Sequence, residues 1–292
     1  MNDAIWVLFF FCKETHKKKS LQKCLRPLDE PFKIEHVINV INKIHILQTI
    51  EPIWTFESVQ NLKVNRFTTW KFCCLMHKTL HDGPVNVLQH SMLYCQKLKL
   101  CAQYWSAKND AMSPCIAWYC KVLYRKLFFH QTYMHFAGNL QIHYDELLLR
   151  DLDICFQLSL DLLDYLEDLL HLQRVIFANM EQHQILAASK KGKCRLASLV
   201  TIIAECNLLY QHSITILRLL HLQLSPDDIS GFSKRFDEIF KELKLFYEHV
   251  RTMQLPWNDF LEIPKLPVMQ PNLYTLTEIQ QEPSAPMICD LE

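Results

Sequence analysis

Residues 196–222, with the sequence LASLVTIIAECNLLYQHSITILRLLHL, decide the fold of this chain. Apolar residues recur there at steps of three and four, and others widen the stripe to most of the circumference of a helix. The stripe consists of Leu196, Leu199, Ile203, Cys206, Tyr210, Ile214 and Leu217, widened by Val200, Ile202, Leu209, Ile216 and Leu220. The pattern predicts a central helix that is covered on several sides.

The flanking residues indicate where this helix begins and where the next one starts. Lys190, Lys191 and Gly192 interrupt the apolar pattern on the N-terminal side. On the C-terminal side, Ser225 and Pro226 precede two acids, which is typical of an N-cap, a first helical position and a first turn. We therefore expect a helical hairpin.

The composition favours an all-α protein in a reducing compartment. Half of the 292 residues are apolar, but only four are glycine, too few for the turns of a β protein. The twelve cysteines show no CxxC spacing, which indicates free, intracellular thiols. Lys plus Arg equals Asp plus Glu at 31 each, so the charge balance does not favour nucleic acid, and an anionic partner needs a local patch.

Outside the central helix, the apolar pattern predicts a succession of antiparallel helices that stack like a solenoid. The expected segments are 53–64, 67–81, 86–105, 113–127, 147–177 and 232–250. On the helix over 147–177, the acids Asp161, Asp164, Glu167 and Asp168 are expected to face water. No repeat of 20 to 50 residues is evident.

The chain divides into three segments. Residues 1–50 form an atypical basic segment, residues 51–255 the helical domain, and residues 256–292 a tail that holds half of all the prolines. The basic segment could approach a membrane surface or could be a solvated leader before an ordinary helix. The apolar run over residues 4–12 is too short to span a bilayer and follows an acid, so we expect neither an anchor nor a signal peptide.

Several residues could be interpreted as metal ligands or catalytic groups, but a role in packing or at the solvated surface is the better interpretation of each. His77 and His81 have metal-ligand spacing, but no third ligand can be placed, so a surface or half-buried pair is expected, and no metal or other cofactor. Cys73 and Cys74 lie within an apolar helix, which favours packing over a nucleophile. The acids over 161–168 could form an acid/base pair, but solvated charges are the more common arrangement. No glycine-rich phosphate loop exists, so the sequence favours a protein that is not an enzyme.

Two PxxP matches lie in the tail, at residues 264–267 and 283–286. They fit a polyproline ligand, or a strap that lies along the domain. The strap, or chance, is the stronger explanation for two short matches in a proline-rich segment.

Four stretches resemble the ANTH domain of the huntingtin-interacting protein 1 and 1-related (Sla2-like) endocytic adaptors. They are 70–88 (WKFCCLMHKTLHDGPVNVL), 156–177 (FQLSLDLLDYLEDLLHLQRVIF), 192–224 (beginning GKCRLASLV) and 236–273 (ending FLEIPKLPVMQPNL). The resemblance covers about residues 53–273. It implies a right-handed superhelical stack of the ENTH/ANTH (VHS-like) type that binds phosphoinositides, in proteins that link clathrin coats to actin.

The resemblance also implies where a headgroup binds. In the ANTH family, lysines near the end of the first helix and the start of the second follow a pattern of Lys, nine residues, Lys, any residue, Lys or Arg, then His or Tyr. Lys33 and Lys43 have the right separation, but Ile44, His45 and Ile46 follow, so the pattern is incomplete. Lys33, Lys43 and His45 are the headgroup candidates, and the missing base should weaken binding.

The expected function is a phosphoinositide-binding adaptor domain of clathrin-mediated endocytosis, cytoplasmic and peripheral to the plasma membrane and clathrin-coated vesicles. Phosphoinositide headgroups and the clathrin and actin machinery are the partners that the resemblance implies, although the coiled coil and actin-binding module are absent from this sequence. The alternative is a helical protein-interaction scaffold that has lost lipid binding. A hydrolase that uses His77 or Cys73 is a remote third.

Overall fold

The computed structural model describes residues 19–142, 151–253 and 262–273, and no strand occurs among them. Residues 19–24 form a first stretch of helix. The helices that follow are α2 (Ile34–Leu47), α3 (Glu51–Trp54), α4 (Glu57–Gln60), α5 (Arg66–Asp82), α6 (Asn86–Met92), α7 (Cys95–Ser106), α8 (Ser113–Thr132), α10 (Leu152–Gln182), α11 (Lys190–Leu196), α12 (Leu199–Gln223) and α13 (Pro226–Thr252). The all-α prediction is confirmed.

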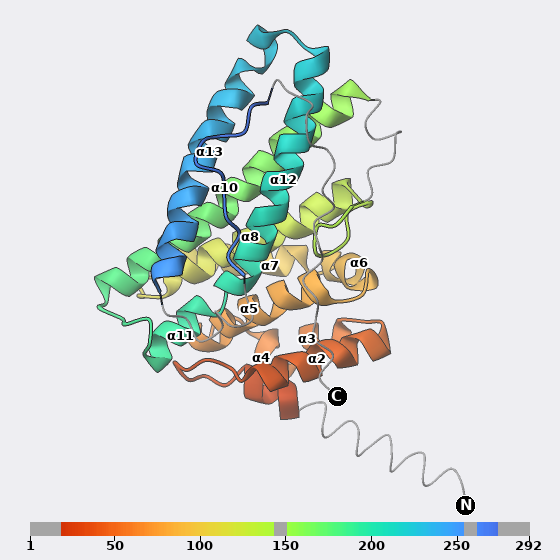
Figure 1. Cartoon of the computed structure of the whole chain (residues 1–292). Helices are drawn as coiled ribbons and strands as arrows, with labels where there is room; N and C mark the ends of the chain where they lie inside the picture. The colour runs from red at the N-terminus through yellow and green to blue at the C-terminus, as the bar shows by residue number, and fades with distance from the viewer. Residues whose placement is uncertain (1–18, 143–150, 254–261, 274–292) are drawn as a thin grey trace, which may run out of the picture.

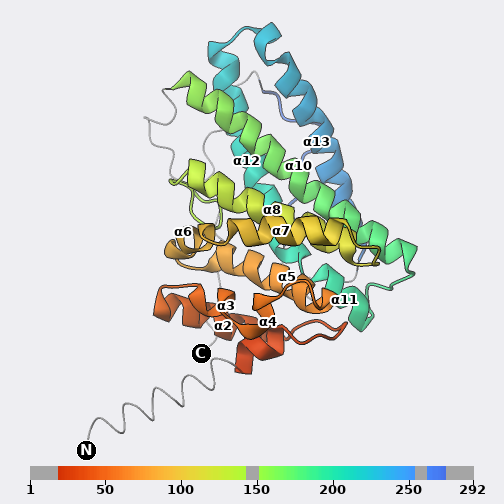
Figure 2. The same cartoon turned by 180° about the vertical axis from the view of Figure 1, so that it is seen from behind.

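The helices form a stack in which each long helix packs on its neighbours (Figure 1). Helices α2, α3 and α4 lie at one end, α5, α7 and α8 in the middle, and α10, α12 and α13 at the other, as the view from behind also shows (Figure 2). Helix α8 contacts α5, α7 and α10, and α10 in turn contacts α12 and α13. One continuous hydrophobic core therefore runs through the stack.

Helix α12 is the covered central helix that its pattern predicts. Ile202, Leu209 and Leu217 are fully buried, because α10, α13 and α5 all pack against this helix. At its C-terminal end the chain turns into α13, where the Ser225 hydroxyl accepts a hydrogen bond from the Asp228 backbone N–H at 3.4 Å. The expected N-cap and helical hairpin are confirmed.

The start of this helix differs from the prediction. Residues 190–192 do not interrupt a helix; they begin the separate short helix α11, capped by Ser189, whose hydroxyl accepts from the Gly192 N–H at 3.0 Å. A Cβ on Gly192 would lie 2.1 Å from the backbone oxygen of Leu186. The glycine is therefore required by the close approach of the preceding loop, a contact that the apolar pattern does not reveal.

Other helix boundaries also differ. The helix expected over 86–105 is two helices, α6 and α7, separated at residues 93–94. The segment expected over 53–64 contains only the two short helices α3 and α4. The long helix expected over 147–177 is described from Leu152 and continues to Gln182. Residues 143–150, which include its expected start, lie outside the described residues.

The described part of the N-terminal segment packs onto the domain. Leu21, Cys24 and Leu25 are buried, and α2 buries Val37 and Ile44 and contacts α5. The first helical residues and α2 thus share the common core. The apolar run over residues 4–12 lies outside the described residues.

At the other end, residues 262–273 run extended along the domain. Ile263 and Leu266 pack against the core, and the Lys244 ammonium donates to the Val268 carbonyl at 3.0 Å. These contacts fit the strap interpretation of the first PxxP match, whereas the second lies outside the described residues. Among the described helices, none is long and apolar enough to cross a bilayer.

Candidate functional site

The junction between the first helix and α2 is exposed to solvent on one side and hydrogen-bonded to α5 on the other. Lys23 lies near the end of helical residues 19–24 and is exposed. In the loop that follows, the carbonyl of Leu25 accepts from the Thr68 hydroxyl at 3.1 Å, and that of Arg26 accepts from the buried Lys71 ammonium at 3.0 Å. Burial lowers the pKa of Lys71. Because α5 satisfies these carbonyls, the loop has a defined conformation.

The far side of the same loop is tied to α11 by two ion pairs. Asp29 pairs with Arg195, and Glu30 pairs with Lys190 at 2.9 Å. The hydrogen bond from Lys190 lowers the pKa of the Glu30 carboxyl. The loop thus joins α5 and α11, which lie far apart in the sequence.

The structure does not bring the three predicted headgroup residues together. Lys33 is exposed at the N-cap of α2, whereas Lys43 lies ten residues along the same helix, about 15 Å further at 1.5 Å per residue. His45, near the C-terminal end, hydrogen-bonds the Asp82 carbonyl at 2.8 Å. Only Lys33 belongs to the junction, and the role of Lys43 and His45 stays a prediction.

The family pattern fits better when it is started ten residues earlier, at Lys23. Nine residues separate Lys23 from Lys33, as the pattern requires, and one unspecified position follows Lys33. Glu35 then occupies the position where the pattern has Lys or Arg, and His36 occupies the position where it has His or Tyr. This alignment departs at one position, and it puts Lys23 at the end of the first helix and Lys33 at the start of the second. Testing each lysine as the start of the pattern would have found it from sequence.

The one departure reverses a charge at the junction. The Glu35 carboxylate lies 4.0 Å from the Lys33 ammonium and 3.6 Å from His36 Nε2. Both Lys33 and Glu35 are largely exposed, whereas His36 is mostly covered. A phosphate at Lys33 and His36 would therefore compete with this carboxylate.

The expectation of a surface or half-buried histidine pair holds for His81, which is half-buried, but is wrong for His77. Its imidazole is fully buried, and Nε2 lies 2.9 Å from Glu205 Oε2 while Nδ1 lies 3.1 Å from the Tyr119 hydroxyl. Burial lowers the pKa of His77, so the neutral ring donates to Glu205 and accepts from Tyr119. In the described part of the chain, no group of three or more His, Cys, Asp or Glu side chains is arranged to hold a metal.

Glu205 is the centre of this buried polar cluster. It also accepts from the Lys126 ammonium at 2.6 Å and from the Tyr165 hydroxyl at 2.6 Å. Burial alone would raise the pKa of Glu205, but the charge of Lys126 and the hydrogen bond from His77 hold this pKa well below the usual range. Lys126 donates a second hydrogen bond, to the Gly138 carbonyl at 2.7 Å. The cluster joins α5, α8, α10 and α12 through side chains that are all fully buried, so its role is structural.

The thiols considered as nucleophiles are inert by their surroundings. Cys73 and Cys74 are buried, and burial raises the pKa of both. The Cys73 sulfur lies 3.7 Å from that of Cys120. A raised pKa removes the thiolate that a nucleophile requires, so core packing is the better interpretation.

The four acids expected to face water on α10 are only half-exposed, and each has a partner: Asp161 accepts from the Tyr133 hydroxyl at 2.6 Å, and the other three pair with arginines. Asp168 and Asp164 both interact with Arg125, at 2.8 and 3.4 Å. Asp164 and Glu167 also accept from Arg235 of α13, each at 2.6 Å. These ion pairs connect α8, α10 and α13 along their half-exposed edge. The spacing of the acids on α10 alone does not reveal these partners.

Comparison with known proteins agrees with this architecture. The model of the ANTH domain family matches residues 17–281. "Huntingtin-interacting protein 1" of Homo sapiens is 30% identical over 278 residues, which cover 94% of this chain and 26% of that protein. "Huntington interacting protein related 1" of Caenorhabditis elegans is 29% identical over 265 residues, covering 90% of this chain and 28% of that protein. The chain thus spans about a quarter of the length of these relatives.

Two solved structures share the fold. One is the ENTH domain from epsin-2 in complex with phosphatidylinositol 4,5-bisphosphate, with a TM-score of 0.76 and 21% identity, covering 87% of this chain and 97% of that one. The other is the endocytic adaptor complex AENTH, with a TM-score of 0.71 and 22% identity, covering 85% of this chain and 97% of that one. Because the family model spans most of the sequence and the helices stack as they do in these neighbours, the chain belongs to the ANTH domain family.

Proposed function

We propose that this chain is a phosphoinositide-binding adaptor domain of clathrin-mediated endocytosis that binds the cytoplasmic face of a membrane. The observation that carries the proposal is the junction before α2, where exposed Lys23 and Lys33 flank a loop anchored on α5 and α11. Membership of the ANTH family and the phosphoinositide bound by the ENTH neighbour support it.

The headgroup ligands in this proposal are Lys23, Lys33 and His36. Two ammonium groups supply charge-assisted hydrogen bonds to phosphate oxygens, and the imidazole supplies a directional donor. The anchored loop fixes the distance between the lysines, which lowers the entropy cost of binding. Glu35 opposes the ligand, so affinity is expected to be lower than with a base at this position.

The wider role is proposed for the whole protein of which such a domain forms part. Relatives of this chain include proteins named for endocytosis, such as "Endocytosis protein end4" of Schizosaccharomyces pombe, 25% identical over 82% of this chain. We propose the same setting here, peripheral to the plasma membrane and clathrin-coated vesicles, with clathrin and actin machinery as partners. The balanced charge of the chain gives no support for a nucleic-acid partner.

The proposed domain performs no chemistry and needs no cofactor. This part of the proposal is supported by the raised pKa of the Cys73 and Cys74 thiols and by the complete internal pairing of His77 and Glu205. A reacting group has to reach a substrate, and these groups do not.

Liposome co-sedimentation tests the proposal. Vesicles with phosphatidylinositol 4,5-bisphosphate should bind the chain more than vesicles of neutral lipid, and binding should fall with salt. Lys23→Gln combined with Lys33→Gln should abolish the difference. Lys43→Gln is the matched control, because this lysine lies on α2 but outside the junction; a loss with Lys43→Gln alone would instead favour the original assignment to Lys33, Lys43 and His45.

A second candidate function is a helical protein-interaction scaffold that has lost lipid binding. Glu35 favours it, because an acid stands where the family pattern has a base. In the same assay, absence of binding at every salt concentration would support the scaffold and overturn the lipid-binding proposal.

A further inference from the structure

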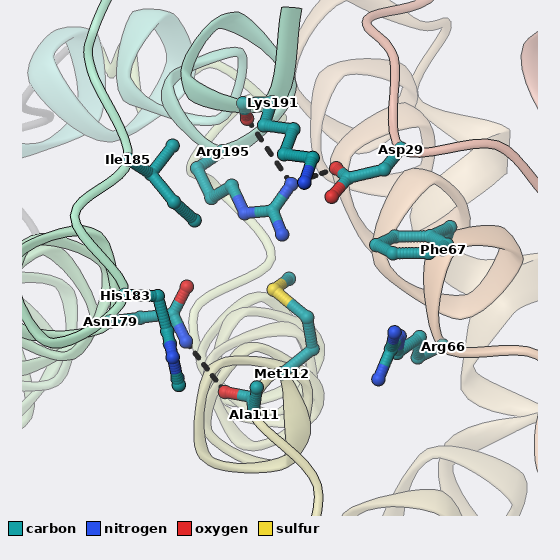
Figure 3. A pocket seen from close by; sticks show the side chains of 10 residues that line it. All are labelled: Asp29, Arg66, Phe67, Ala111, Met112, Asn179, His183, Ile185, Lys191 and Arg195. Atoms are coloured by element: carbon teal, nitrogen blue, oxygen red, sulfur yellow. Dashed lines mark hydrogen bonds and ion pairs between the residues drawn. The ribbon is translucent and has the colours of Figure 1, made fainter.

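A cavity of about 180 Å³ lies beside the junction, between the loop 25–33, α5, the end of α10 and α11. Figure 3 shows the guanidinium of Arg195 extending into this space, with Asn179 and Arg66 also at its wall. Lys23, Lys33 and His36 are not among its lining residues. The cavity is therefore separate from the proposed headgroup ligands.

Two buried polar groups at this wall lack a partner. Arg195 is 4% exposed, and its Nη1 pairs with Asp29 and with the Lys191 carbonyl, but its Nε–H meets no acceptor among the described residues. Asn179 is 5% exposed and uses its amide N–H on the Ala111 carbonyl. Its Oδ1 likewise meets no donor in the described part of the chain. A buried cation with an incomplete set of hydrogen-bond partners is costly, so the site favours an anion against the guanidinium of Arg195.

The two arginines of the cavity are held by one aromatic ring. The guanidinium carbons of Arg66 and Arg195 lie 4.8 and 5.7 Å from the centroid of the Phe67 ring. Cation–π contacts of this kind fix the position of a guanidinium and leave its N–H edges available. The site is therefore built before a ligand arrives.

The charge of the lining favours an anion. Arg66, Lys191 and Arg195 contribute three positive charges and Asp29 one negative charge, with His183 as a further potential donor. Arg66 also pairs with Asp110. Burial lowers the pKa of Arg195 to about 10.

We propose that this cavity binds a phosphate-type oxyanion, free or carried by a lipid headgroup, with the guanidinium of Arg195 as its central cation. Arg66 and Lys191 supply further charge-assisted hydrogen bonds from the more open side. A tetrahedral oxyanion suits the site, since its oxygens accept hydrogen bonds from several directions. Such an anion competes with Asp29 for the guanidinium of Arg195.

The test uses the full chain, inorganic phosphate as the probe, and the arginine Nε–Hε signals in a ¹⁵N–¹H NMR spectrum, at constant ionic strength set with chloride. Phosphate should shift the Arg195 signal saturably, and Arg66→Gln with Lys191→Gln should weaken the apparent affinity by about tenfold or more, as expected for loss of hydrogen bonds to charged groups. Lys193→Gln, on the same helix but outside the lining, is the control. Asp29→Asn should strengthen binding, a gain that a merely structural role for Asp29 would not produce.

Further measurements distinguish a free phosphate from a lipid headgroup as the ligand, and distinguish this cavity from the headgroup junction. Soluble inositol 1,4,5-trisphosphate and vesicles with phosphatidylinositol 4,5-bisphosphate are compared with inorganic phosphate; a response to phosphate in solution assigns a free anion, and a response only to the inositol probes assigns a headgroup. Lys23→Gln with Lys33→Gln should leave the Arg195 shift intact. No shift with any of the three probes, or a shift lost only in the Lys23 and Lys33 variant, would overturn the second site whatever the outcome of the vesicle assay.

Discussion

Replacing Glu35 by lysine should convert the incomplete headgroup pattern into a complete one. In the structure, the Glu35 carboxylate lies 4.0 Å from Lys33 Nζ and 3.6 Å from His36 Nε2. It therefore neutralises part of the charge that would attract a phosphate and occupies donors that the phosphate would use. Glu35→Lys removes this competition and adds a third ammonium group to the junction.

The expected gain follows from the change in charge. The substitution changes the local charge by two units, and each basic residue near an anionic membrane surface contributes about 1 kcal/mol. The free energy of binding should improve by about 2 kcal/mol, which corresponds to about a thirtyfold increase in affinity. Glu35→Gln removes the acid without adding a base, so about half of this free energy is expected.

Co-sedimentation with vesicles that contain phosphatidylinositol 4,5-bisphosphate measures the effect. Glu51→Lys is the matched control, because it makes the same change of charge at an exposed position in the first turn of α3, beyond the far end of α2. If Glu35→Lys and Glu51→Lys increase binding equally, the gain is a general electrostatic attraction and the junction is not a specific site. If Glu35→Lys leaves binding unchanged, the assignment of Lys23, Lys33 and His36 is wrong.

Three further predictions concern stability, and urea unfolding measures each of them. Glu205→Gln leaves the buried Lys126 without its counter-charge and should lower the free energy of unfolding by about 3–5 kcal/mol. The control, Glu248→Gln at an exposed position, should change the free energy of unfolding by less than about 0.5 kcal/mol. Equal effects of the two substitutions would refute the structural role of the Glu205 cluster. Burial lowers the pKa of His130 to about 3. The contribution of neutral His130 to the free energy of unfolding is therefore complete above about pH 6.5, the pKa in the unfolded chain, and declines as the pH falls toward 3. His130→Gln should flatten the dependence of the free energy of unfolding on pH between these two values. Gly192→Ala places a Cβ 2.1 Å from the Leu186 oxygen and should cost about 1–3 kcal/mol, and an unchanged unfolding midpoint would contradict the close approach.

The helices themselves were largely predictable from sequence, because each buries an apolar stripe that repeats at the helical period. The signals at their ends were less reliable. Ser225 and Pro226 were interpreted correctly, since a cap acts on its own first turn. The interpretation of Gly192 as an interruption of the helical pattern was wrong. A glycine is required there because a Cβ would collide with the carbonyl oxygen of Leu186, which belongs to the loop before the helix.

The candidate site was only partly predictable. The sequence predicts Lys33 together with Lys43, whereas we propose Lys33 together with Lys23, because spacing alone does not say which lysine ends the first helix. The ends of α2 favour Lys23 in this proposal, since Lys33 lies at the N-cap of α2 and Lys43 lies within the helix. The cavity around Arg195 could not be predicted at all, because its walls come from separate segments spread between Asp29 and Arg195.

The sequence by itself determined that this chain is a stack of amphipathic helices, because helix period, composition and capping residues are local properties. The tertiary structure decided how the charges are used. It buried His77 against Glu205, paired the acids of α10 with Arg125 and Arg235, and brought Asp29 to Arg195. The energy of a charge depends on its burial and on the nearest opposite charge, and both are set by residues distant in sequence.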